Sequence, residues 1–223
     1  MDIPRLHAVT DDRILAGGTI GSTGSSSAGS WFLETAPTVL EAGGGDLALH
    51  LRGPASPGSL LVEAARELLP VARSVGARLM INDRVDVALA VGADGVHLGR
   101  RSLSPTTARR LLGLDVPVGV SVHSLEEGVE ARDEGADYLF AGTIYASSSH
   151  PDRAASGTGL LKELSEGVDR PHARLPVIAI GGMNPARVPE ITAVGAYGAA
   201  SISAIWDADD PAGAVREFLE AFP

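Results

Sequence analysis

Short apolar runs alternate with longer amphipathic segments along the whole chain. Eight of these runs have the length and pattern of β-strands, at residues 6–10, 46–52, 78–82, 94–98, 118–122, 136–141, 176–180 and 198–202. Several are continuously apolar, which is typical of strands that are covered on both faces. The segments between them carry apolar residues at helical spacing, as at 60–73 and 185–194.

Eight strands with interleaved helices in 223 residues predict a single (β/α)8 TIM barrel spanning residues 1–223. A doubly wound open sheet is the alternative. The segments 91–96, 134–139 and 194–199 each contain a G-A pair where a helix is expected to turn into the next strand. This repeat supports a barrel and says nothing about function.

Two polar segments interrupt the alternation, at residues 16–30 and 143–158. The first is rich in glycine and serine, so we expect a flexible loop. In a barrel both segments leave the face where the carboxyl ends of the strands meet, and active sites of barrels lie there. Long loops at such a face often act as lids.

Composition and charge narrow the possible function classes. The chain has no cysteine, which excludes disulfides and thiolate chemistry and agrees with a cytoplasmic location. The N-terminus lacks a signal-peptide pattern, and no apolar run reaches the roughly 18 residues of a membrane span. A net charge of −10 argues against a general nucleic-acid surface. We therefore expect a small-molecule substrate and no membrane or nucleic-acid partner, and a homo-oligomer stays possible.

The clearest motif consists of I-A-I-G-G-M (178–183) after the seventh strand and A-S-I-S-A-I (200–205) after the eighth. Glycines and a short helix at these two strand ends would direct backbone N–H groups to one point, where barrels commonly bind phosphate. We predict that Gly182, Ile202 and Ser203 donate these N–H groups and that Gly181 permits close approach. A tight turn that needs glycine is the simpler alternative.

His123 follows the fifth strand directly, and Ser124 and Glu127 have the S-x-x-E spacing of a capping box. The imidazole is therefore expected at the barrel mouth, just outside a helix N-terminus whose positive end favours the neutral ring. Such a ring is a candidate acid or base, and a structural histidine is the alternative.

Further polar residues are expected at the same mouth because they also follow strands: Arg52, Asn82, Asp83, Arg100, Arg101, Ser147, Ser149 and His150. An arginine in this position can pair with a phosphate or a carboxylate. Other basic residues are expected on solvated helix faces or in the barrel wall: Arg84, Arg109, Arg110, His7, His50 and His97.

The chain resembles the thiamine phosphate synthase superfamily over nearly its whole length. The matching segments are L-H-A-V-T-D-D (6–12), L-H-L-R (49–52), I-N-D-R-V-D-V-A-L (81–89), A-D-G-V-H-L-G (93–99), G-A-D-Y (135–138) and P-V-I-A-I-G-G-M (176–183). The synthase of this superfamily joins a pyrimidine diphosphate to a thiazole phosphate with Mg²⁺.

Three positions depart from the synthase pattern. Pro54 stands where a lysine follows L-x-x-R, Ser102 stands where an aspartate binds the metal, and S-S-S-H (147–150) replaces T-x-T-K. Asp83 alone remains of the carboxylate pair, so we expect no metal site, with Asp83 as the single candidate ligand. These departures fall on the diphosphate chemistry and spare the thiazole phosphate site.

The segments R-S-L-S-P (101–105) and S-V-H-S-L-E-E (121–127) instead resemble the TenI-type branch, the thiazole tautomerases. This resemblance implies an isomerase of thiamine biosynthesis in which His123 moves a proton on a carboxylated thiazole phosphate, without metal or cofactor. Arg52 and Asn82 then contact the carboxylate end or the ring. Ser147 and Ser149 close over the substrate, whose phosphate is held by the amides after strands seven and eight.

The tautomerase is the main hypothesis, and two alternatives stay open. A divergent thiamine phosphate synthase would be a Mg²⁺-dependent transferase and would require the pyrimidine diphosphate. A non-catalytic barrel that binds a thiazole or thiamine phosphate would keep the phosphate motifs and would not need His123.

Overall fold

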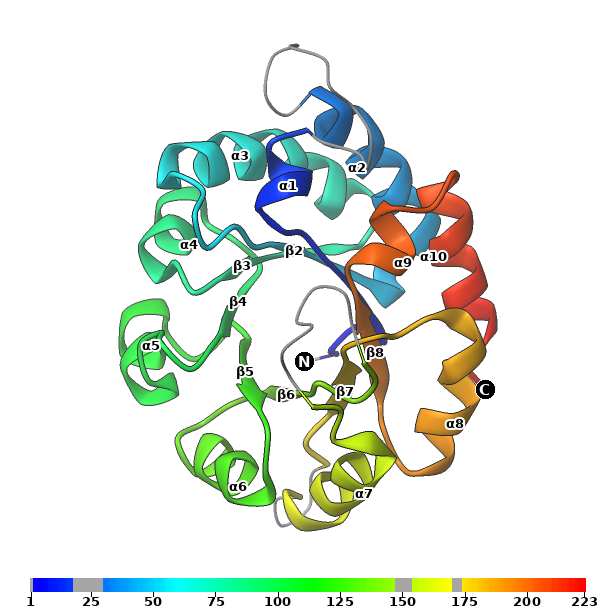
Figure 1. The fold of residues 1–223 in the computed structure, drawn as a ribbon. Helices are drawn as coiled ribbons and strands as arrows, with labels where there is room; N and C mark the ends of the chain where they lie inside the picture. The colour runs from blue at the N-terminus through cyan, green and yellow to red at the C-terminus, as the bar shows by residue number, and fades with distance from the viewer. Residues whose placement is uncertain (1, 18–29, 147–153, 170–173) are drawn as a thin grey trace.

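The eight apolar runs form parallel strands that close into one barrel in the computed structural model, which describes residues 2–17, 30–146, 154–169 and 174–223 (Figure 1). The strands are β1 (Leu6–Val9), β2 (Leu47–Leu51), β3 (Arg78–Asn82), β4 (Gly95–Leu98), β5 (Val118–Val122), β6 (Tyr138–Ala141), β7 (Val177–Ile180) and β8 (Gly198–Ser201). Each strand pairs with the next, and β8 returns to β1 with Ala199 opposite Leu6. The predicted TIM barrel is confirmed, and the open-sheet alternative is wrong.

The helices form a ring around this barrel (Figure 1). Their bounds are α1 (Asp12–Leu15), α2 (Ser30–Gly43), α3 (Gly58–Ser74), α4 (Val85–Val91), α5 (Pro105–Leu112), α6 (Leu125–Asp133), α7 (Gly157–Gly167), α8 (Val188–Ala193), α9 (Ser203–Trp206) and α10 (Pro211–Glu220), with 3₁₀ turns η1 (Gly44–Asp46) and η2 (Pro185–Arg187). None of the helices in the described part of the chain has both the length and the apolar character needed to cross a membrane.

The predicted turns from helix to strand adopt the expected left-handed conformation. Gly92, Gly135 and Gly195 have φ values of 64°, 97° and 97°. Residues with a Cβ rarely adopt this conformation, so glycine lets the chain leave α4, α6 and α8 and enter the next strand within a few residues.

Large side chains fill the barrel interior at the amino-terminal ends of the strands, and the interior is open at their carboxyl ends. Met80, Tyr138, Phe140 and Ile178 pack together inside the barrel and are fully or almost fully buried. Gly119 on β5 makes room for them, because a Cβ there would overlap the Tyr138 ring. The large side chains thus close the amino-terminal half, and the cavity lies at the carboxyl ends of the strands.

Arg109 differs from its expected place on a solvated helix face. Its side chain is 16% exposed and pairs with Asp137, and its guanidinium also donates to the carbonyl oxygens of Val116 (2.6 Å) and Gly135 (3.0 Å). The turns around β5 and β6 carry carbonyl groups that need donors, and the five N–H groups of an arginine on α5 supply them. Arg109 is therefore a structural residue.

Candidate active site

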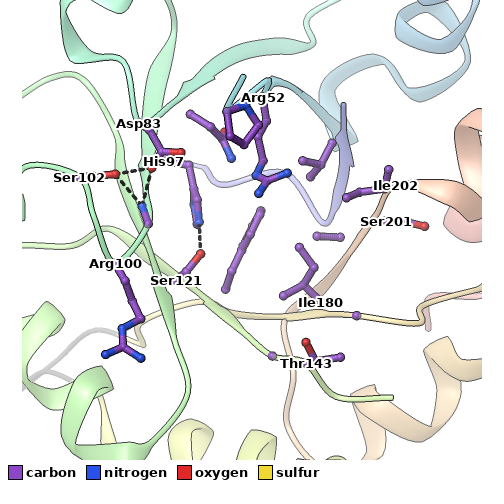
Figure 2. A pocket seen from close by; sticks show the side chains of 18 of the residues that line it. Arg52, Asp83, His97, Arg100, Ser102, Ser121, Thr143, Ile180, Ser201 and Ile202 are labelled. Atoms are coloured by element: carbon purple, nitrogen blue, oxygen red, sulfur yellow. Dashed lines mark hydrogen bonds between the residues drawn. The ribbon is translucent and has the colours of Figure 1, made fainter. Parts of the chain in front are cut away.

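A cavity of about 550 Å³ opens at the carboxyl ends of the strands (Figure 2). All eight strands or the loops that directly follow them contribute residues to its lining. Among the predicted site residues, those that line it are Arg52, Asn82, Asp83, Arg100, Arg101, His123, Gly181, Gly182, Ile202 and Ser203. Ser147, Ser149 and His150 lie outside the described residues, as does most of the glycine- and serine-rich segment at 16–30.

The loop after β7 requires glycine at two successive positions. Gly181 and Gly182 have φ values of 97° and 63°. A Cβ on Gly181 would lie 2.5 Å from the side chain of Thr143, and one on Gly182 would lie 2.6 Å from the carbonyl oxygen of Ala146. Arg187 holds this loop from outside, because its guanidinium donates to the carbonyl oxygen of Gly182. The loop is thus rigid and free of side chains where it meets the cavity.

The chain leaves β8 directly into the same part of the cavity. Ile202 precedes α9, and Ser203 is its first residue. The first residues of a helix have N–H groups that the helix itself leaves without a partner. The loops after β7 and β8 therefore meet at one end of the cavity, where the sequence predicts phosphate binding.

Among the described residues, the cavity lining contains two histidines, His97 and His123, and the following arginine and aspartate side chains: Arg52, Arg84, Arg100, Arg101 and Asp83. Arg84 is paired with Asp86, at 2.6 Å. Figure 2 shows Arg52 extending from β2 into the cavity. The cavity is thus lined by more positive than negative side chains, although the chain has a net charge of −10.

The backbone of Arg52 is fixed by contacts between the first two loops. Its N–H donates to the Thr10 hydroxyl (2.8 Å), and that hydroxyl donates to the carbonyl oxygen of Arg52 (2.9 Å). The Asp12 carboxylate accepts hydrogen bonds from the Ser56 hydroxyl (2.7 Å) and the Ala55 N–H (3.0 Å). The loops after β1 and β2 therefore fix the backbone from which the Arg52 side chain extends into the cavity.

Asp83 is the single carboxylate among the described residues that line the cavity, and its contacts are structural (Figure 2). Its Oδ1 atom accepts a hydrogen bond from the Gly99 N–H (2.9 Å) and another from the Ser102 hydroxyl. Within the described residues, no three acidic or histidine side chains are grouped so that they could hold a metal ion. One carboxylate that already ties two loops together does not fit a Mg²⁺ site built by the protein.

His123 stands at the rim, and Glu127 tethers it. The Glu127 carboxylate accepts from the backbone N–H of His123 (2.7 Å) and lies 3.1 Å from the ring Nδ1. Burial of Glu127 raises its pKa, but the hydrogen bonds from His123 outweigh this effect and keep the pKa below its usual value. Ser124 caps α6 by accepting from the Glu127 N–H, at 3.2 Å. The predicted capping box is present with one difference. The Glu127 carboxylate accepts a hydrogen bond from the backbone N–H of His123 instead of the backbone N–H of Ser124.

His7, His50 and His97 lie in the barrel wall as expected, but the buried polar network that they form under the cavity was not predicted. His7 and His50 are fully buried and His97 is 2% exposed. His50 lies 2.8 Å from His7 and 2.9 Å from Asn82, and His97 lies 2.8 Å from Ser121. Burial lowers the pKa of His50 to about 4 and lowers the pKa of His7 and His97 well below the usual value. The sequence feature that could have indicated this network is the presence of one inward histidine on each of the strands β1, β2 and β4.

Comparison with known proteins gives one consistent family. A model described as thiamine monophosphate synthase matches residues 23–205. The chain is 44% identical to the thiamine-phosphate synthase of Chloroflexus aurantiacus over 158 residues, which are 70% of each protein. It is 43% identical to the thiamine biosynthesis bifunctional protein ThiM/ThiE of Symbiobacterium thermophilum over 189 residues. These are 83% of this chain but 38% of that longer protein.

A solved structure agrees with this result. The thiamine phosphate pyrophosphorylase of Pyrococcus furiosus superposes with a TM-score of 0.78 and 32% identity, covering 97% of this chain and 94% of that one. The similarity thus extends over the whole barrel.

The expectation of an isomerase is wrong. Relatives at 39–44% identity are named thiamine-phosphate synthase, a transferase. The physical reason lies in the S-V-H-S-L-E-E segment, which carried that expectation. Its Ser124 and Glu127 form the start of α6 and hold His123 in place, so the segment describes how a helix begins and does not define the reaction. The matches over most of its length show that the chain belongs to the thiamine monophosphate synthase family, a family of thiamine biosynthesis.

Proposed function

We propose that the protein is a transferase that joins a phosphorylated thiazole to a pyrimidine carrying a diphosphate, with release of the diphosphate. The names of its relatives supply the reaction class. The observation that carries the proposal is the arginine-lined cavity that also contains the glycine loop. Two anionic substrates need positive charge and N–H donors at two places, and this cavity offers both.

The two substrates would occupy different parts of the cavity. The thiazole phosphate binds at the loops after β7 and β8, through the N–H groups of Gly182, Ile202 and Ser203. The diphosphate binds near Arg52, Arg100 and Arg101, which follow β2 and β4. β4 lies across the barrel from β8, and β2 is separated from β8 by β1 (Figure 1).

The arginines then act on the departing group. The thiazole nitrogen forms a bond to the carbon of the pyrimidine substrate that carries the diphosphate. The bond from this carbon to the diphosphate oxygen breaks at the same time, so negative charge builds up on the diphosphate. Fixed guanidinium groups stabilise such charge because they are already oriented when it develops. Arg100 and Arg101 directly follow H-L-G and precede Ser102, the position where the synthase pattern has its second carboxylate.

His123 becomes a substrate contact in this proposal. Glu127 holds the ring at the rim, and Arg100 interacts electrostatically with the same carboxylate. His123 and Arg100 are therefore on the same side of the cavity. We assign to His123 a hydrogen bond to the diphosphate.

The test is a synthase assay with both substrates. The wild-type protein is expected to form thiamine phosphate and diphosphate. Arg52→Ala is expected to lower kcat/KM by roughly 100-fold or more, on the scale of losing one stabilising donor to developing charge. Arg66→Ala removes an exposed arginine of α3 outside the cavity and is the matched control, with unchanged activity expected.

The assay is run with MgCl₂ and with a chelator. Absence of product under both conditions, with thiazole phosphate binding retained in calorimetry, would contradict the transferase and support a binding protein. Loss of activity to the same extent in Arg52→Ala and Arg66→Ala would remove the assigned role of Arg52.

A further inference from the structure

A continuous chain of hydrogen-bonding groups runs under the cavity through β1, β2 and β3. It begins at the carbonyl oxygen of Pro4, which lies 3.0 Å from Nε2 of His7. Nδ1 of His7 lies 2.8 Å from Nε2 of His50. Nδ1 of His50 lies 2.9 Å from Oδ1 of the Asn82 side-chain amide. Asn82 is 7% exposed and lines the cavity, so the chain ends at the candidate site.

The carbonyl group at the start of this chain fixes the direction of every hydrogen bond. A neutral imidazole has one N–H donor and one acceptor nitrogen, and a carbonyl oxygen can only accept. Nε2 of His7 must therefore carry the hydrogen, which makes Nδ1 of His7 an acceptor. His50 then donates from Nε2, and its Nδ1 is an acceptor. The group of Asn82 that faces His50 must consequently be a donor.

Only the NH₂ end of an amide can donate, and the two ends of an amide have nearly the same shape. The hydrogen-bond chain therefore requires the Asn82 amide to be turned over relative to the orientation in which Oδ1 faces His50. The NH₂ group then faces His50, and the carbonyl oxygen is the end left for the cavity. The opposite orientation, with the amide oxygen toward His50, would need an additional proton on the two histidines.

Burial makes that additional proton unfavourable. The pKa of His50 is lowered to about 4 by burial, and the pKa of His7 is lowered by burial and by the nearby His50. The other titratable groups packed against these rings are His97 and Tyr138, with ring centroids 5.7 Å from His50 and 5.4 Å from His7. Burial lowers the pKa of His97 and raises that of Tyr138, so both are neutral at pH 7.

We propose that His7 and His50 are positioning residues that orient the Asn82 amide with its carbonyl oxygen toward the cavity. At this point the site accepts a hydrogen bond, so it selects a ligand that offers an N–H, an amino group or a hydroxyl. The hydrogen bonds of the protein itself carry this inference, and it does not depend on the proposed reaction. If the protein is a transferase, the orientation favours an amino-substituted ring over a ring that offers only acceptors.

The test reads the protonation of the ring nitrogens by ¹⁵N NMR of the protein without ligand at pH 7. In the wild type, His7 and His50 are both expected as neutral rings with the hydrogen on Nε2. A through-hydrogen-bond coupling is expected between the Asn82 NH₂ group and Nδ1 of His50. Hydrogen on Nδ1 of His50 in the wild type would overturn the proposal.

Asn82→Asp tests the direction of the chain. A carboxylate only accepts, so His50 must move its hydrogen to Nδ1. Nε2 of His7 would then face the Pro4 carbonyl oxygen as an acceptor, unless the two rings take up a proton. The expected result is hydrogen on Nδ1 of His50 and one proton taken up by the two rings. An unchanged His50 spectrum would contradict the proposal. The wild-type spectrum decides the question even if this variant does not fold.

His97 lies outside this chain of hydrogen bonds. Its partners are the hydroxyl groups of Ser121 (2.8 Å) and Tyr138 (3.3 Å), which can both donate and accept, so the Pro4 carbonyl does not fix which of its nitrogens carries the hydrogen. A synthase assay that fails leaves these NMR results unaffected, and the two proposals can therefore be separated.

Discussion

Gly182 combines a left-handed backbone with a position at the cavity. Gly182→Ala is expected to lower the free energy of unfolding by roughly 1–2 kcal/mol because of its φ of 63°. It is also expected to weaken thiazole phosphate binding by about tenfold or more, because the new methyl group pushes against the Ala146 carbonyl and moves the loop. Denaturant unfolding and calorimetry measure the two effects.

Gly92→Ala is the matched control for Gly182→Ala. Gly92 has nearly the same φ of 64°, but a Cβ there meets nothing within 4 Å, and it lies outside the cavity lining. The control should lose a similar amount of stability and retain full affinity. Equal loss of affinity in both variants would show that Gly182 acts through general stability alone.

At the scale of the element, the start of α6 links helix stability to the site. Ser124→Ala removes the hydroxyl that caps α6 and is expected to cost about 1 kcal/mol of unfolding free energy. It should also raise the KM of the synthase reaction, because the first turn of α6 carries Glu127, which holds His123. Unfolding curves and steady-state kinetics provide the measurement.

Ser104 offers a comparison, since it caps α5 in the same way by accepting from the Thr107 N–H. Ser104→Ala should cost similar stability and leave KM unchanged. A KM that rises equally in both variants would mean that the two caps affect the site only through stability.

The strands and several local elements could be predicted from the sequence because they depend on neighbouring residues. The eight apolar runs, the glycines after β7 and the Ser124 cap are patterns within a few positions. The contacts of Arg109 and the chain from His7 to Asn82 join residues on different strands and loops. They depend on which side chains meet inside the closed barrel, and no short segment contains that information.

At the scale of the whole molecule, the buried histidines make stability depend on pH. The unfolded chain binds a proton at His50 near its usual pKa of 6.5, but the folded protein does so only near pH 4. The contribution of neutral His50 to the free energy of unfolding is fully present above pH 6.5 and is lost as the pH falls toward 4. It amounts to about 3 kcal/mol over that range.

Urea unfolding at pH 7 and pH 5 measures this effect. The wild type is expected to lose on the order of 2 kcal/mol through His50 alone. His7 and His97 add to the loss, because their pKa values are lowered in the same direction. His50→Gln should show a smaller difference between the two pH values. Identical differences in both proteins would exclude His50 as a source.

The arginines at the cavity mouth also determine how an anion reaches the site. A chain of net charge −10 repels a phosphorylated molecule at long range, while Arg52, Arg100 and Arg101 attract it near the opening. At physiological ionic strength both effects fade over about 8 Å, so the attraction acts only close to the mouth. Capture is therefore a short-range step: an anion that comes within this distance of the mouth is drawn toward the cavity.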